Sequence, residues 1–189
     1  MAAPSPGATV THRRWLQMTA GGAAVVSVTA FINPLPRLMW NATASVPTGL
    51  YSIEPTADRT PGELVAVMPP EPLASYLADG GYLPRGVPLL KHVTALPGQR
   101  VCRSGLIITV DGRPMGSARE QDRRGRLLPS WSGCRAIAPG ELFLMNPAAP
   151  DSLDGRYFGP LPARSVLGRA TPLWTDPPRQ TRAAADDRQ

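Results

Sequence analysis

The sequence is nearly devoid of nitrogen side chains that could accept a proton near neutral pH. Its 20 basic residues include a single lysine, Lys91, and it contains only two histidines, His12 and His92. Arginine supplies every other basic position, stays protonated in proteins and cannot act as a general base. The candidates for a nitrogen base are therefore these three residues.

Cysteine is also scarce. Cys102 and Cys134 are the only two, and neither a CxxC spacing nor neighbouring histidines accompany them, which excludes a typical zinc site. They form either a disulfide or two buried thiols, and the compartment decides which. We expect no metal and no cofactor.

Charged residues make up only 18% of the chain, although the net charge is +6. The arginines are spread along the sequence, and their densest group, residues 119–126, includes two acidic residues and no aromatic residue. A nucleic-acid surface usually shows a basic stripe, and binding of single strands also uses aromatic stacking platforms. We interpret residues 119–126 as a solvated loop and expect no nucleic-acid partner.

A long stretch without charge lies at residues 15–36, directly after His12, Arg13 and Arg14. About 20 uncharged, mostly apolar residues can span a bilayer as a helix, and the preceding arginines favour a cytoplasmic start. We predict that residues 1–14 are cytoplasmic, that 15–36 form a membrane anchor, and that the domain after them is exported. A cleavable signal peptide, with twin-arginine export as one form, is the alternative. An exported domain lies in an oxidising space, so we expect the two cysteines to be bridged.

The rest of the chain has the pattern of short strands separated by glycine and proline. We predict six strands and, from an Asp-Gly pair after the fourth, a hairpin turn. The strands are expected at residues 49–53, 63–68, 88–96, 106–110, 141–145 and 166–174. One short helix is predicted at 72–79, with Pro72 in its first turn and two glycines after it. Residues 37–174 thus form one mostly antiparallel β domain, followed by a disordered tail at 175–189.

Lys91 stands in an apolar run, VPLLKHVTALPGQR at residues 87–100. Burial there would disfavour the charged form of the lysine and lower its pKa, so that the neutral amine can act as a base. Leu89 and Leu90 would exclude water beside the amine and are our candidates for contacting a substrate. His92 follows directly, and neighbouring strand residues point to opposite faces, so the two cannot line one site. The competing interpretation is an edge-strand lysine that reaches solvent.

The segment NATASVPTGLY at residues 41–51 offers a nucleophile. Ser45 lies in a turn-rich loop that Pro47 stiffens before a strand begins. A rigidly held serine can give its proton to a lysine amine and attack a carbonyl, and the Ser45 amide with the Thr43 hydroxyl could hold the resulting oxyanion. The competing interpretation is an ordinary connector. If residues 15–36 are an anchor, Ser45 works within about 30 Å of the membrane.

With these residues in place, the sequence resembles the type I signal peptidases, membrane peptidases that use a serine and a lysine to remove leader peptides. The resemblance covers residues 15–174 and rests on three blocks in the family's order. They are SVPTG at 45–49, LLKHVTALPGQRV at 89–101 and FLMNPAAPDSLDGRYFGPL at 143–161. The resemblance implies Ser45 as nucleophile, Lys91 as general base and a mostly β signal-peptidase-like domain with one transmembrane helix. It places that domain in the periplasm, at the bacterial inner membrane.

The third block carries further implied roles. By resemblance, Asp154 is a catalytic residue that orients the lysine together with Ser152, and Arg156 supports it. Physically, the Ser152 hydroxyl could hold the amine while Asp154 and Arg156 pair behind it. The competing interpretation is that Asp154 belongs only to a tight turn.

Two departures from the general secretory enzymes point to one branch of the family. The nucleophile block is one residue shorter before its proline, and NPAAPDS stands in place of a GDNRDNS segment. Both, with the cysteine pair, resemble the conjugative-transfer branch, the TraF-type peptidases that process pilin precursors. This implies a membrane-tethered propilin as substrate, the inner membrane and other transfer proteins as partners, and either hydrolysis or closure of the pilin into a ring.

Three other functions compete with this interpretation. The first is a general type I signal peptidase that acts on secreted preproteins. The second is a self-cleaving repressor, which would need a DNA-binding helix-turn-helix that residues 15–36 do not offer. The third is a non-catalytic assembly component of a transfer apparatus, which would not need Ser45.

Overall fold

The computed structural model describes residues 12–31 and 37–177, and the chain divides into two compact units, Met1–Leu35 and Pro36–Gln189. In the first unit, helix α1 spans His12–Phe31. No helix in the described part of the chain is both long enough and apolar enough to cross a membrane.

Parts of three predicted segments lie outside the described residues. They are residues 1–11 of the expected cytoplasmic segment, 32–36 of the expected anchor and 178–189 of the expected tail.

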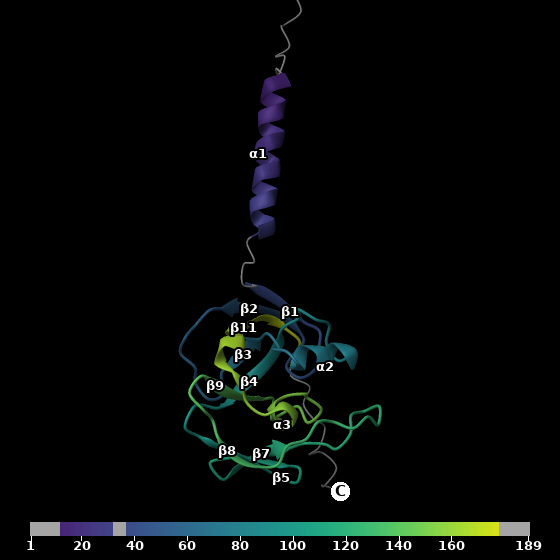
Figure 1. Ribbon diagram of the computed structural model, residues 1–189, viewed down its shortest axis with the longest axis vertical. Helices are drawn as coiled ribbons and strands as arrows, with labels where there is room; N and C mark the ends of the chain where they lie inside the picture. Colours follow the sequence, from purple (N-terminus) through teal and green to yellow (C-terminus); the bar gives the residue numbers. More distant parts are fainter. Residues whose placement is uncertain (1–11, 32–36, 178–189) are drawn as a thin grey trace, which may run out of the picture. The chain divides into compact units, whose positions relative to one another are not determined.

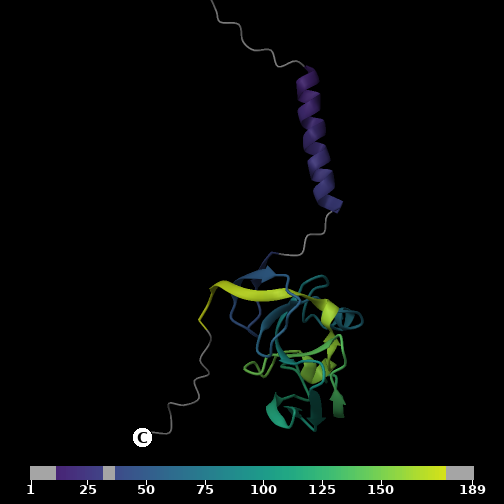
Figure 2. The ribbon, with the colours of Figure 1, turned by 90° about the vertical axis from the view of Figure 1, so that its left-hand side faces the viewer.

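The second unit is built from antiparallel strands in two sheets (Figure 1, Figure 2). The seven-stranded sheet has the order β1-β2-β11-β3-β4-β9-β10, and the four-stranded sheet has the order β7-β6-β5-β8. The large sheet contains β1 (Leu38–Asn41), β2 (Gly49–Glu54), β3 (Leu64–Val67), β4 (Leu89–Ala95), β9 (Glu141–Met145), β10 (Leu161–Pro162) and β11 (Val166–Thr175). The small sheet contains β5 (Arg100–Ser104), β6 (Ile107–Val110), β7 (Arg113–Ser117) and β8 (Gly133–Ala136). The predicted mostly antiparallel β fold is confirmed.

The helical elements of this unit are short. They are α2 (Leu73–Asp79), α3 (Gly155–Phe158) and the 3-10 turn η1 (Ala163–Ser165). Helix α2 matches the predicted helix, with Pro72 at its N-cap and Gly80 at its C-cap. Proline suits a helix start because the first backbone N–H groups need no partner within the helix.

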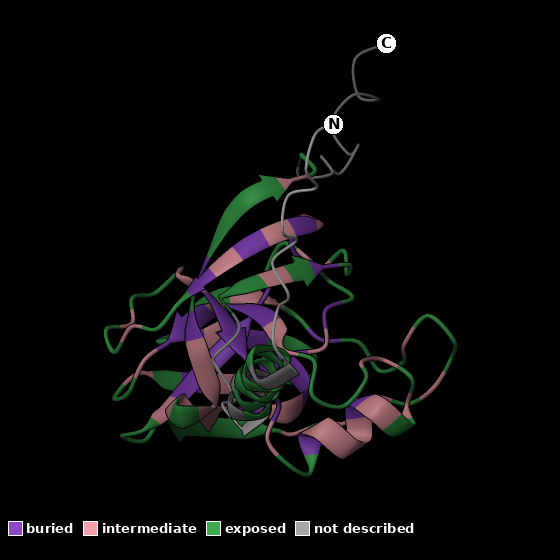
Figure 3. Cartoon of the chain, turned by 90° about the horizontal axis from the view of Figure 1, so that it is seen from above, coloured by how far each residue is buried: buried purple, intermediate pink, exposed green. Residues whose placement is uncertain are grey.

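The core lies mainly in the strands of the two sheets, where the buried residues are concentrated (Figure 3). One buried cluster contains Phe143 of β9 together with Val101 of β5 and Ile108 of β6, so it joins the two sheets. A second cluster combines residues of β2, β3, β4 and β11 with Val46 from the loop after β1. Burial of this apolar area supplies most of the favourable free energy of folding.

All six predicted strands are present, and their ends differ from the prediction by at most one residue. The predicted Asp-Gly turn is also present: Asp111 and Gly112 have φ angles of 48° and 78°, and they join β6 to β7. Positive φ at both central residues is the geometry of a tight hairpin turn that matches strand twist.

Four further strands of four or five residues were not predicted, and the reason lies in their side chains. In β5 one inward position is occupied by Arg103, which is buried although it is charged. Strand β7 contains Pro114 and Gly116, and every residue of β8 is exposed. Strand β1 has only its last residue, Asn41, buried. None of these strands shows the alternation of apolar and polar residues on which strand prediction relies.

Two long-range links join segments that are far apart in the sequence. Cys102 of β5 and Cys134 of β8 are paired in register and form a disulfide, which confirms the predicted bridge. Strand β11 continues to Thr175, and the Asp176 N–H donates to the Thr48 carbonyl over 2.8 Å. The first two residues of the expected tail are therefore held against the loop before β2.

Candidate active site

Lys91 lies in the interior of the large sheet. Its strand, β4, is flanked by β3 and β9, and Lys91 is paired with Val65 of β3. The residue is only 4% exposed. The interpretation of Lys91 as an edge-strand lysine that reaches solvent is therefore wrong, because β4 has a neighbour on each side and the side chain is buried.

The environment of the Lys91 amine favours its neutral form. Burial lowers the pKa of Lys91 to about 8, and the positive charge of Arg156 acts in the same direction, while attraction to Asp154 opposes both. The amine donates to the Ser152 hydroxyl over an Nζ–Oγ distance of 2.7 Å. A neutral amine that donates one hydrogen bond keeps its lone pair available to accept a proton.

Asp154 and Arg156 form a buried ion pair beside this amine. Arg156 donates through Nε and Nη2 to the two Asp154 carboxylate oxygens, each over 2.9 Å. Arg156 and Asp154 are 1% and 4% exposed. Loss of one partner would leave the other charge buried and unpaired, which typically costs about 3–5 kcal/mol. Asp154 accepts no hydrogen bond from Lys91 in the described part of the chain, so it acts on the amine through its charge.

The same ion pair shapes the loop that carries Ser152. Asp154 is the N-cap of α3 and accepts from the Arg156 N–H. The Arg156 guanidinium also donates to the carbonyls of Ala149 and Ser152 over 2.6 and 3.2 Å. Five donors in a fixed planar fork allow one arginine to hold several carbonyls at once. The interpretation of Asp154 as only a turn residue is thus too narrow, because its carboxylate organises the Arg156 side chain.

Asn146 is a buried site residue that sequence reasoning missed. Its side chain donates to the Leu90 carbonyl over 3.0 Å and accepts from the His92 N–H over 3.1 Å, so it contacts the residues on both sides of Lys91. Its backbone N–H donates to Asp154 over 3.0 Å. Asn146 thereby links β4 to the buried ion pair. It stands in the third sequence block, but nothing in the sequence distinguished it from its neighbours.

Ser45 lies in the loop between β1 and β2, which pair with each other. Its neighbour Val46 is 6% exposed and belongs to the same core cluster as Leu90, the residue before Lys91. This cluster anchors the loop that carries Ser45 to the sheet that carries the Lys91 amine. Leu90 itself is 4% exposed, whereas Leu89 is half-buried, so of the two substrate-contact candidates Leu89 has more surface to offer.

The Ser45 hydroxyl has one long contact, with the Thr43 hydroxyl at 3.4 Å. The Thr43 hydroxyl donates to Asn41 Oδ1 over 2.8 Å. Since a hydroxyl has a single hydrogen, Ser45 must be the donor in its contact with Thr43. Among the described residues, nothing accepts a hydrogen bond from the Ser45 backbone N–H, which leaves this donor available for an oxyanion.

The predicted residues therefore form two networks. Lys91, Ser152, Asp154 and Arg156 are brought together in one, and Ser45 and Thr43 in the other. No hydrogen bond joins Ser45 to Lys91 in residues 37–177. Their chain neighbours Val46 and Leu90 belong to one apolar cluster.

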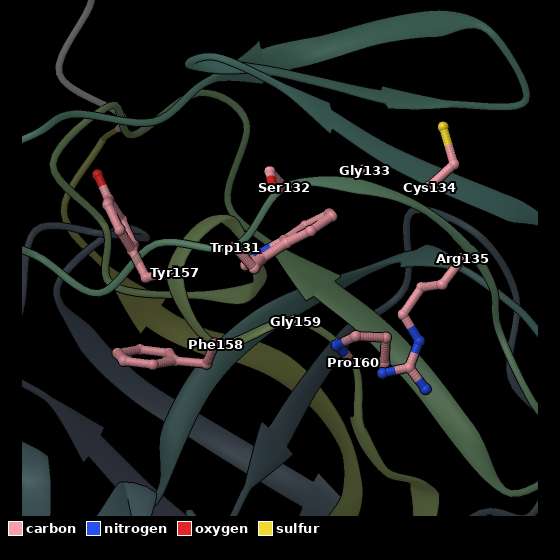
Figure 4. Close-up of a pocket in the computed structure, with 9 residues that line it drawn as sticks. All are labelled: Trp131, Ser132, Gly133, Cys134, Arg135, Tyr157, Phe158, Gly159 and Pro160. Carbon is pink, nitrogen blue, oxygen red and sulfur yellow. The ribbon is translucent and has the colours of Figure 1, made fainter.

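No group of three or more His, Cys, Asp or Glu side chains is placed to hold a metal ion within the described residues. A separate pocket of about 260 Å³ lies between residues 131–135 and 157–160 (Figure 4). Its arginine, Arg135, is already paired with Glu141 over 2.8 Å. None of the predicted site residues lines this pocket except the disulfide residue Cys134, so we place the chemistry at the two networks instead.

Known proteins are similar to this chain over most of its length. The family model described as signal peptidase, peptidase S26, matches residues 12–174. A conjugal transfer protein TraF of Agrobacterium fabrum is 39% identical over 150 residues, which cover 73% of this chain and 82% of that protein. A TraF of Agrobacterium tumefaciens is 38% identical over 180 residues, covering 87% and 97%. Among solved structures, a signal peptidase I of Enterococcus faecalis is 19% identical and covers 64% of this chain and 100% of that one, with a TM-score of 0.38.

Proposed function

Since the chain belongs to the signal peptidase family, peptidase S26, and within it to the TraF type, we propose that it is a serine endopeptidase that processes a membrane-tethered pilin precursor in conjugative transfer. The observation that carries the proposal is the Lys91 amine, buried and with its pKa lowered to about 8. A lysine in that state serves as a general base at physiological pH, which no arginine can do.

The proposed reaction begins with the Ser45 hydroxyl. Its Oγ attacks the scissile carbonyl while the Lys91 amine takes its proton, and an acyl-enzyme forms when the leaving amine departs with that proton. Ser45 must first turn its hydrogen from Thr43 toward the amine. The hydrogen bond from Lys91 to Ser152 aims the lone pair, because it restricts rotation of the neutral amine at the end of a long side chain.

Charge that develops on the carbonyl oxygen needs two donors. The unpaired Ser45 N–H is one, and we assign the Thr43 hydroxyl as the other. Donors of this kind stabilise a tetrahedral intermediate because they are in place before the charge appears.

The second half of the reaction decides the product. If Lys91 activates a water, the acyl-enzyme is hydrolysed to a linear pilin; if the amine of the pilin's own N-terminus attacks, the chain closes into a ring. Both routes use the same base and the same oxyanion donors. Mass spectrometry separates them, since the ring is lighter than the linear product by one water.

We also propose that the protein lies in the bacterial inner membrane, with its N-terminus in the cytoplasm and the β domain in the periplasm. Helix α1 has no charged residue after Arg14. The β domain exposes Trp40 and Trp174, with ring centroids 6.0 Å apart, and exposed tryptophan is typical of surfaces at a membrane–water interface.

Protease added to intact spheroplasts should therefore digest the β domain but spare a tag placed before His12. The control is the same treatment after lysis, when the tag should be lost as well. A domain that is protected in intact spheroplasts would rule out the periplasmic location.

The proposed function is tested by the pH dependence of precursor cleavage. The base must be neutral, so the rate should rise as pH approaches the Lys91 pKa of about 8 and then level off. About 1% of the amine is neutral two pH units below its pKa, so kcat/KM at pH 6 should be about 100-fold below the plateau. We would measure initial rates from pH 6 to 10 with the detergent-solubilised full chain and its pilin precursor. A profile that is flat between pH 6 and 8 would exclude Lys91 as the base.

A further inference from the structure

Asn41 is the last residue of β1, and its side chain contacts both halves of the following loop, residues 42–48, which carries Ser45. Its amide nitrogen Nδ2 faces three backbone carbonyls, those of Thr43, Val46 and Pro47, at 2.8, 3.2 and 3.0 Å. Its Oδ1 accepts from the Thr43 N–H at 3.1 Å and from the Thr43 hydroxyl at 2.8 Å. Asn41 is 7% exposed and is the one buried residue of β1.

These contacts allow only one orientation of the amide. Three carbonyl oxygens require the NH₂ group on one side, and a backbone N–H requires an acceptor on the other. Asn41 therefore holds the loop on both sides of Ser45, at Thr43 before it and at Val46 and Pro47 after it. The Tyr51 hydroxyl adds a second bond to the Pro47 carbonyl over 2.7 Å.

Ser45 itself accepts and donates nothing within this framework except its long contact with Thr43. The loop is thus rigid at the residues around the nucleophile, while the nucleophile and its N–H stay unengaged. This is the arrangement that an oxyanion site needs, because its donors must be held without being satisfied by the protein.

We propose that Asn41 is a positioning residue for catalysis: it fixes the Ser45 N–H and the Thr43 hydroxyl in the geometry that binds the oxyanion. The inference rests on the proposed peptidase function. In the resting protein Asn41 Oδ1 accepts a hydrogen bond from the Thr43 hydroxyl, and when the tetrahedral intermediate forms, that hydroxyl turns its hydrogen to the oxyanion. Asn41 does not touch the substrate.

Asn41 has two opposing effects on the rate, and their sizes decide the sign. Giving up a neutral hydrogen bond to Asn41 Oδ1 slows the reaction by less than about tenfold. Losing a held oxyanion donor slows it by about 100- to 1000-fold. Removal of Asn41 should therefore reduce the rate, because the loss of position exceeds the relief of competition.

The test uses single-turnover cleavage of the pilin precursor by excess detergent-solubilised full chain. Asn41→Ala and Thr43→Val should each lower the maximal cleavage rate about 100-fold. The enzyme concentration at half-maximal rate should change by less than about threefold, because neither group binds the ground state. The double variant should be no more than about threefold slower than the slower single variant, because both substitutions disable the same site.

Thr48→Val is the matched control. Thr48 lies in the same loop, where its hydroxyl donates to Asp176, and its loss should leave the rate within about threefold of the wild type. A general loosening of the loop would slow this variant too, whereas loss of the oxyanion site would not.

Several outcomes would overturn the inference. The first is an Asn41→Ala or a Thr43→Val variant that cleaves at the wild-type rate. The second is a double variant whose loss of rate equals the product of the losses in the two single variants. If Asn41→Ala melts below the assay temperature, Asn41→Ser replaces it under the same criteria, since a serine can still accept from the N–H two residues on. Failure of the peptidase proposal itself is distinguishable, because then Ser45→Ala would cleave as well as the wild type.

Discussion

Replacing Lys91 with arginine is expected to abolish cleavage of the pilin precursor, although the charge at the position is conserved. A positioned general base contributes about 10²- to 10⁴-fold to a rate. Arginine cannot give up its proton in a protein, so we expect kcat/KM to fall at least about 1000-fold at pH 8, with no recovery at pH 10. Full processing by Lys91→Arg would exclude the neutral-amine mechanism.

Lys91→Met separates this chemical effect from a loss of folding. The folded-state pKa of about 8 lies below the ordinary value of 10.5, so the fold disfavours the charged amine. The resulting cost to stability is present in full below pH 8, decreases as the pH rises toward 10.5, and amounts to up to about 3 kcal/mol. Lys91→Met removes the charge, so it should be inactive yet more stable than the wild type at pH 7.

The sign of that stability change is the informative result. Urea unfolding at pH 7 and pH 10 gives the free energy of unfolding of the wild type and of Lys91→Met. This free energy should be higher for Lys91→Met at pH 7, and the difference should be smaller at pH 10. Lys91→Arg should be less stable than the wild type at both values, because its buried charge cannot be neutralised. If the difference in the free energy of unfolding between Lys91→Met and the wild type grew with pH, the lowered pKa of Lys91 would be contradicted.

Replacing Ser45 with alanine is expected to remove both processing and conjugative transfer while the protein remains folded and present at normal levels. Loss of a nucleophile in a serine peptidase lowers kcat by about 10⁶-fold, and the half-buried Ser45 accepts no bond on which the loop depends. Cleavage is measured with purified components, and transfer by mating of cells that carry the variant.

Ser132→Ala is the control for Ser45→Ala, since Ser132 is exposed and lies outside both networks. It should process and transfer normally. The two assays together also separate a peptidase from a non-catalytic assembly component: such a component would keep transfer in the Ser45→Ala variant. Adding Lys91→Met to Ser45→Ala should cause no further loss, because the two groups act in one step.

The strands that were predicted correctly share one property: the pattern of apolar residues in their own sequence indicates which residues are buried. Strand β2 alternates between buried and less buried residues, and β9 is a short apolar run, so local pattern was enough to find both. Strand β8 has no such pattern because all of its residues are exposed. It is held in place by pairing with β5 and by the disulfide, and these are contacts with residues far away in the chain.

The residues of the candidate site also fall into those that the sequence could identify and those that it could not. Lys91 and Ser45 could be chosen from the sequence because the chemistry restricts which residue types can serve, and Ser152, Asp154 and Arg156 followed from the resemblance. Asn41 and Asn146 could not be chosen, since an asparagine in a loop has many roles. Their importance arises from which carbonyls and N–H groups surround the amide after folding.

The sequence by itself determined the available chemistry: one lysine, one serine block before it and one block after it, in a β domain. Only the tertiary structure decided that this lysine is buried and that its pKa is lowered to about 8. The pKa of an amine depends on how much water it loses and on which charges face it. Burial is the largest cause here, and the two charges that act on the amine, Asp154 and Arg156, lie more than 60 positions away in the chain. A lysine with the same neighbours in sequence but exposed on an edge strand would have lacked this burial, which is the main cause of the lowered pKa.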